Sequence, residues 1–136
     1  MDKLQWKREK TLTEPNSIKL FEQEKGFSVP TELKELVKKH NGGRPSPNEI
    51  NTVDGTELEV KGLLSFNKED VENIYDVVDY FKGNFNNTLL PFATESGGNF
   101  YCINLTNNSI IFWEHETNEQ IPVARNLKDF LSRLAK

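Results

Sequence analysis

The chain has 136 residues, of which 35% are hydrophobic and 28% are charged. This is the length of one ordinary domain with a buried core, and we expect a single domain over residues 1–136. The formal net charge of −4 disfavours direct nucleic-acid binding, because an acidic protein repels phosphate backbones.

The sequence predicts a cytoplasmic protein without membrane contact. Residues 1–7 lack the apolar run of a secretion signal, and no segment approaches the roughly 18 apolar residues that span a bilayer. The single cysteine, Cys102, cannot form an internal disulfide, which is typical of a reducing compartment.

The first predicted elements are an arm and a helix. Residues 1–12 carry charge without periodicity, so we expect a loosely packed arm whose Trp6 contacts the body. A helix is predicted over residues 15–25, with Thr13 as its cap and Pro15 in its first turn.

A second helix is predicted over residues 30–40. Its apolar positions follow the spacing of one buried face, which contains Leu33, Leu36, Val37 and His40. Gly42 or Gly43 is expected in the left-handed conformation that follows many helix ends. The prolines of residues 44–48 then predict a surface loop.

Asp54-Gly55 predicts a two-residue type I′ hairpin between strands over residues 49–53 and 56–66. A third helix should follow, capped by Asn67 with Asp70 and ending near Gly83, with a loop at residues 84–88. Its predicted buried residues are Val71, Ile74, Tyr75, Val78 and Phe81.

A second hairpin is predicted around a turn at Asn107-Asn108, which sets Cys102 opposite Trp113. Because both faces of this strand pair are apolar, we expect it in the centre of a sheet. A last strand over 121–124 precedes a helix capped by Asn126 with Asp129, and this helix buries Leu127, Phe130, Leu131 and Leu134.

Strands in the middle of the chain and helices at both ends predict an α+β domain. We expect a bent antiparallel β-sheet flanked by N-terminal, inserted and C-terminal helices.

Two sequence blocks resemble a known family. One is Asn41-Gly42-Gly43 after the second helix, and the other comprises residues 90–93, 97–105 and 111–116. Their order and spacing resemble the SUKH superfamily of Smi/Knr-type domains. The resemblance implies a bent sheet flanked by helices. Most bacterial members look like immunity proteins, which bind the C-terminal domain of a polymorphic toxin.

The residues that could carry catalysis or hold a metal are few. His40 and His115 are the only histidines, and no Cys-x-x-Cys or His-x-x-x-His spacing is present. Cys102 lies in an apolar strand, where a buried structural thiol is expected. Gly97-Gly98 lacks the Lys-Ser/Thr of a phosphate loop and predicts a bulge or a tight turn at the start of a strand. We therefore expect no enzyme, no metal and no cofactor.

The first functional hypothesis is an immunity protein that binds a toxin domain, which we expect to be a basic nuclease, and neutralises it by stoichiometric occlusion. The alternative is a non-catalytic regulatory or scaffold module of the cell-wall-regulator type. An enzyme or small-ligand binder is disfavoured. The candidate partner-binding residues lie in three surface segments: Asn41, Gly42, Gly43, Arg44, Asp54, Glu57, Glu59, Glu95, Ser96, Gly98 and Asn99.

Overall fold

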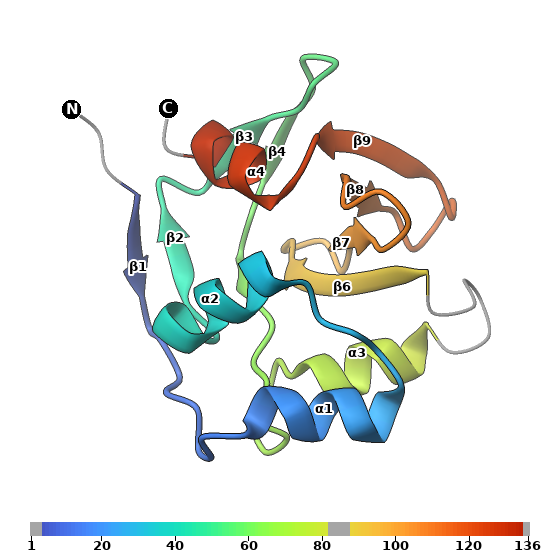
Figure 1. Cartoon of the computed structure of the whole chain (residues 1–136). Coiled ribbons are helices and arrows are strands. Elements are labelled where there is room, and N and C mark those ends of the chain that lie inside the picture. The colour runs from blue at the N-terminus through green and yellow to red at the C-terminus, as the bar shows by residue number, and fades with distance from the viewer. Residues whose placement is uncertain (1–3, 82–87, 135–136) are drawn as a thin grey trace.

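A computed structural model describes residues 4–81 and 88–134 of the chain (Figure 1). The fold is α+β with antiparallel strands, as the sequence predicts. The described helices are α1 (Ser17–Lys25), α2 (Thr31–His40), α3 (Ile74–Tyr80) and α4 (Leu127–Leu134). The described strands are β1 (Gln5–Lys7), β2 (Arg44–Ser46), β3 (Glu49–Asn51), β4 (Glu57–Glu59), β5 (Gly62–Leu63), β6 (Leu89–Thr94), β7 (Phe100–Asn104), β8 (Ile110–Trp113) and β9 (Gln120–Ala124).

The main sheet has the strand order β5-β6-β7-β8-β9, so β7 is its central strand. The central position predicted for the β7–β8 hairpin is therefore confirmed. Its register differs by two residues from the prediction, because Cys102 lies opposite Ile111 and Ile103 opposite Ile110. The turn is longer than two residues, and Asn104 N–H donates to Ser109 O across it (2.8 Å). A shift of two keeps every side chain on its predicted face.

Each face of this sheet contributes to its own apolar cluster. Tyr101, on one face, packs on Phe130 of α4, with ring centroids 5.5 Å apart. On the other face, Cys102 and Trp113 cluster with Phe81, which follows α3. Helices α1 and α3 lie side by side below the sheet in the view of Figure 1. The predicted helix end near Gly83 and most of the predicted loop at 84–88 lie outside the described residues.

The β3–β4 hairpin has a five-residue loop rather than the predicted type I′ turn. Asn51 pairs with Glu57, and only Gly55 of the loop has a positive φ, of 89°. A type I′ turn needs positive φ at both central residues. Asp54 is not among the residues with positive φ, and its side chain accepts a hydrogen bond from Thr56 N–H (3.1 Å).

Two predicted helix caps are wrong and one is confirmed. Neither Thr13 nor Asn67 caps a helix: the side chain of Asn67 accepts from Thr13 N–H (2.9 Å). Asn73 caps α3 by accepting from Asp76 N–H (2.9 Å), which leaves Val71 outside the helix and 96% exposed. Asn126 caps α4 as predicted, since it accepts from Asp129 N–H (2.8 Å).

The N-terminal segment is more ordered than the predicted loose arm. Its strand β1 pairs with β2, and Trp6 packs on His40 as part of the body. The predicted surface loop at 44–48 is wrong for its first part. Pro45 lies within β2, opposite Trp6. Proline is compatible with a short edge strand, where its missing N–H costs no ladder bond.

Candidate partner-binding surface

One end of the main sheet is acidic. From Thr88 to Ala124 the sequence has four glutamates and no lysine or arginine. Antiparallel pairing brings the β6–β7 and β8–β9 turns to the same end of the sheet, and β4 lies beside the first of them. We call this surface the acidic end. Its carboxylates belong to Glu95, Glu114, Glu116 and Glu119 of the two turns, to Glu59 of β4, and to Glu57, which is two residues before Glu59 and therefore on the same face of that strand.

The β6–β7 turn is tight and internally bonded. Glu95 N–H donates to Asn99 O (3.0 Å), and Gly98 N–H donates to Glu95 O (3.1 Å). The Glu95 carboxylate accepts from Gly97 N–H (2.8 Å) and from the Asn99 amide (3.0 Å). Gly98 has a φ of 89°, which favours glycine. Of the two predicted alternatives at Gly97-Gly98, a bulge and a tight turn, the structure has the tight turn.

Side chains tie this turn to its two neighbours. The Glu59 carboxylate of β4 accepts from the hydroxyl of Ser96 (2.9 Å) and from its N–H (3.1 Å). Asn99 Oδ1 accepts from His115 N–H (3.0 Å) and lies 2.8 Å from His115 Nδ1. The acidic end is therefore one connected surface, although it is built from segments that are far apart in the sequence.

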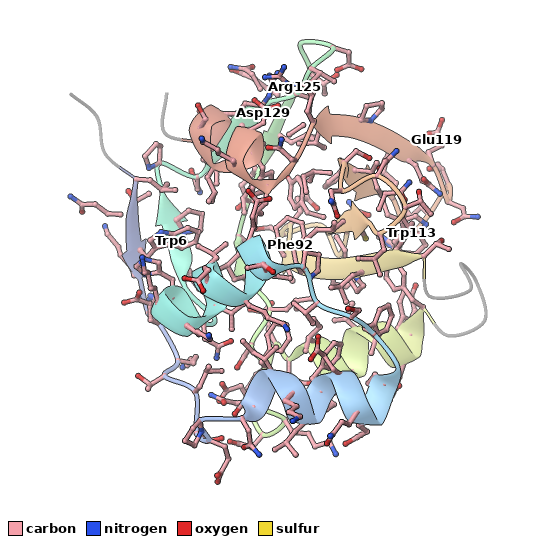
Figure 2. The ribbon with its side chains drawn as sticks, viewed as in Figure 1. Trp6, Phe92, Trp113, Glu119, Arg125 and Asp129 are labelled. Atoms are coloured by element: carbon pink, nitrogen blue, oxygen red, sulfur yellow. The ribbon has the colours of Figure 1, made fainter. Side chains whose placement is uncertain are left out.

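The acidic end differs from the rest of the molecule in its ion pairs. Among the described residues, none of its six carboxylates forms a salt bridge. Carboxylates elsewhere do: Glu72 with Lys61 (2.8 Å), Glu24 with Lys68 (2.7 Å) and Asp129 with Arg133 (3.1 Å). Figure 2 shows Glu119 and Trp113 on one side of the molecule and Trp6 on the opposite side. The six carboxylates without a salt bridge among the described residues therefore belong to one named surface, the acidic end.

Asp54 stands apart from the acidic end. It lies at the tip of the β3–β4 hairpin, where the neighbouring Val53 N–H donates to Val123 O of β9 (3.1 Å). Hydrogen bonds from the Thr52 hydroxyl, and then from Thr56, hold the pKa of Asp54 below its usual value. The tip therefore adds a second, separate negative charge.

The Asn41-Gly42-Gly43 block is not a free surface. Asn41 is 3% exposed, and its side chain bonds Lys10 O (2.7 Å), Ser65 Oγ (2.9 Å) and Phe66 N–H (2.8 Å). Gly43 is buried and Gly42, with a φ of 67°, is the left-handed residue. Arg44 is exposed and lies 4.0 Å from Glu72. The prediction of Asn41 and Gly43 as open contact residues is wrong, because this block holds chain segments together.

The reactive side chains are dispersed. Cys102 is fully buried, and burial raises the pKa of its thiol. His40 contacts Glu9 and His115 contacts Asn99, so the two histidines have different partners. Within residues 4–81 and 88–134, no three His, Cys, Asp or Glu side chains group as metal ligands do.

Comparison with known proteins identifies the family. The chain belongs to the SMI1/KNR4 family (SUKH-1), whose family model matches residues 13–133. It is also 25% identical over 118 residues to the SPbeta prophage-derived uncharacterized protein YokK of Bacillus subtilis (strain 168). That alignment covers 73% of this chain and 60% of the relative, so the chain matches less than two thirds of that protein. No helix in the described parts is long and apolar enough to span a membrane.

Proposed function

We propose that the protein is a cytoplasmic immunity protein that binds the C-terminal domain of a cognate polymorphic toxin. It neutralises the toxin by covering its active surface in a fixed ratio, without catalysis or a cofactor. The observation that carries this proposal is the acidic end, whose six carboxylates lack ion pairs among the described residues. Membership of the SMI1/KNR4 family supports a protein-binding role.

The chemistry of the acidic end fits a basic protein surface. A nuclease must attract phosphates, so its cleft carries a positive potential that an acidic surface can fill. Glu59 and Glu95 are already held by hydrogen bonds, which lowers the entropy lost on binding. Gly98, in the same turn as Glu95, is exposed and has no side chain, so a partner's main chain can approach closely. Ser96 and Asn99 complete the proposed contact surface.

Co-expression tests this function. The wild-type chain should restore growth to cells that produce the C-terminal domain of the toxin encoded beside it, and the two proteins should co-purify in a fixed ratio. The control is a catalytically inactive toxin domain, which should co-purify equally well. Failure to protect against, and to bind, any neighbouring toxin would overturn the proposal and favour the regulatory or scaffold module.

A further inference from the structure

Tyr80 is the exposed end of a row of aromatic side chains. It is the last residue of α3 and is 58% exposed. Its ring lies edge-on to the ring of Trp113 in β8, with centroids 6.0 Å apart, and edge-on to Phe81, at 6.1 Å. Phe81 in turn lies 4.8 Å from Trp113 and 5.9 Å from Phe100. Contacts with two other rings therefore hold the Tyr80 ring at the surface.

This aromatic row adjoins the acidic end. Trp113 is the last residue of β8, directly before the β8–β9 turn that carries three glutamates of the acidic end. Trp113 Nε1–H donates to Asn118 Oδ1 in that turn (2.6 Å), so the ring beside Tyr80 is bonded to the acidic end itself. Figure 2 shows Trp113 and Glu119 on the same side of the molecule. One partner can therefore contact the exposed ring and the carboxylates together.

Helix α3 adds a further carboxylate beside the ring. Asp76 is exposed and lies four residues before Tyr80, on the same face of the helix. Its carboxylate accepts from the Asn73 amide (3.0 Å) and forms no salt bridge with any described residue. Within the described parts of the chain, the ring that a lysine covers is Tyr75, with Lys68 Nζ 5.0 Å from its centroid, and not Tyr80. The surroundings of Tyr80 are therefore negative and open to a cation from outside.

We infer that Tyr80 is the anchor of the partner interface and that its ring binds an arginine side chain of the toxin domain. This inference rests on the proposed function, and the charge of the surface specifies the chemistry of the occupant. The face of an aromatic ring attracts a cation, and carboxylates from α3 and from the β8–β9 turn attract the same charge. An uncharged apolar partner would instead remove these carboxylates from water without pairing them.

Arginine fits this position better than lysine. Its planar guanidinium stacks on an aromatic ring and can still donate hydrogen bonds to neighbouring carboxylates, whereas an ammonium is a compact and strongly hydrated charge. Tyrosine, tryptophan and arginine are also the residues that most often carry the binding energy of protein interfaces. Tyr80 is therefore expected to determine specificity, while the glutamates of the acidic end mainly accelerate association.

Two peptides of equal charge test the ring without the toxin. The probes are fluorescently labelled hexa-arginine and hexa-lysine, and anisotropy at low salt gives their dissociation constants for the full-length protein. We expect the preference for hexa-arginine to fall at least about threefold in Tyr80→Leu, which keeps an apolar side chain but removes the ring. The preference should persist in Tyr80→Phe, which keeps the ring. A preference that is unchanged in Tyr80→Leu, or lost equally in Tyr80→Phe, overturns the inference.

The catalytically inactive toxin domain tests the anchor itself. Tyr80→Leu should raise the dissociation constant at least tenfold, whereas Tyr80→Phe should change it by less than about threefold. The control is Val71→Ala, which should bind as wild type does. Val71 is also exposed and apolar, but it lies before the first residue of α3, at the opposite end of the helix from Tyr80.

The outcomes separate the anchor from the proposed function. If wild type binds the toxin domain and a folded Tyr80→Leu binds it equally well, the anchor is wrong while the immunity function stands. If wild type binds no toxin domain, the proposed function fails, and the assignment of Tyr80 to a toxin interface fails with it. If Tyr80→Leu lacks a cooperative thermal transition, Tyr80→Gln replaces it in both experiments.

Discussion

The two glycine blocks, Asn41-Gly42-Gly43 and Gly97-Gly98-Asn99, have the same composition in opposite order, yet their structural roles differ. Asn41 is buried and its side chain bonds two separate segments, at Lys10 and at residues 65–66, whereas Asn99 is half-buried and bonds only the turns beside it. Gly43 is enclosed by Trp6 and by a carbonyl, whereas Gly97 is exposed. The same residue types assemble the interior in one block and shape a surface in the other.

The position of each block explains the difference. Asn41 follows the end of α2 at the junction of the arm, β2 and residues 65–66, so any polar side chain there must find partners inside the protein. Asn99 directly precedes β7 at the tip of a hairpin, where water reaches the turn. Substitutions in the two blocks should therefore separate stability from binding.

The largest difference is expected between the two asparagines. Asn41→Ala should lower the free energy of unfolding by about 2 to 4 kcal/mol, because it leaves the Lys10 carbonyl and the Phe66 amide without their partner. Asn99→Ala should cost about 1 kcal/mol or less, since water can replace its bonds. Urea unfolding of both variants measures this, and equal losses would contradict the distinction.

The glycines without positive φ give the next comparison. A Cβ on Gly43 would lie 2.9 Å from the His40 carbonyl oxygen, which cannot move freely, so Gly43→Ala should cost about 1 to 3 kcal/mol. A Cβ on Gly97 would lie 3.0 Å from a Glu95 carboxylate oxygen and 3.5 Å from the Asn99 amide nitrogen, which are side-chain ends that can shift by a few tenths of an ångström. Gly97→Ala should therefore stay within about 0.5 kcal/mol of wild type in thermal unfolding. A costlier Gly97 variant would show that the turn is as constrained as the interior.

The smallest effect concerns the separate charge at the hairpin tip. Hydrogen bonds from Thr52 and Thr56 lower the pKa of Asp54, so the carboxyl should stay ionised below the usual midpoint of about 3.9. Thr52→Val removes the largest contribution and should move the midpoint upward. Carboxyl NMR titration of both proteins measures the change, and an unchanged midpoint would refute the assigned cause.

Local sequence signals predicted much of the fold. The apolar spacing of Leu33, Leu36 and Val37 located the buried face of α2, and Asn126 with Asp129 located the start of α4. Both signals come from residues that lie within one or two helical turns of each other in the sequence. Thr13 and Asn67 misled for the same reason, because each resembles a local cap but bonds the other across the fold.

The candidate surface was only partly predictable. The turn at Gly97-Gly98 follows from its own residues. The contacts of Glu59 with Ser96 and of Asn99 with His115 join residues far apart in the sequence, so no neighbouring residue indicates them. The same holds for Asn41, whose burial depends on segments from elsewhere in the chain. The absence of lysine and arginine from residues 88–124 was the available signal for the acidic end.

The most direct test of the acidic end is the association rate with the toxin domain, measured for two matched charge reversals. One variant carries Glu57→Lys, Glu116→Lys and Glu119→Lys, whose side chains are exposed. The control carries Glu14→Lys, Glu32→Lys and Glu35→Lys, also exposed but away from the acidic end, with the same change in net charge.

We expect the first variant to associate at least tenfold more slowly than the control at low salt, with the difference shrinking as salt screens surface charges within about 8 Å. Equal rates for the two folded variants would contradict the assignment of the acidic end as the binding surface.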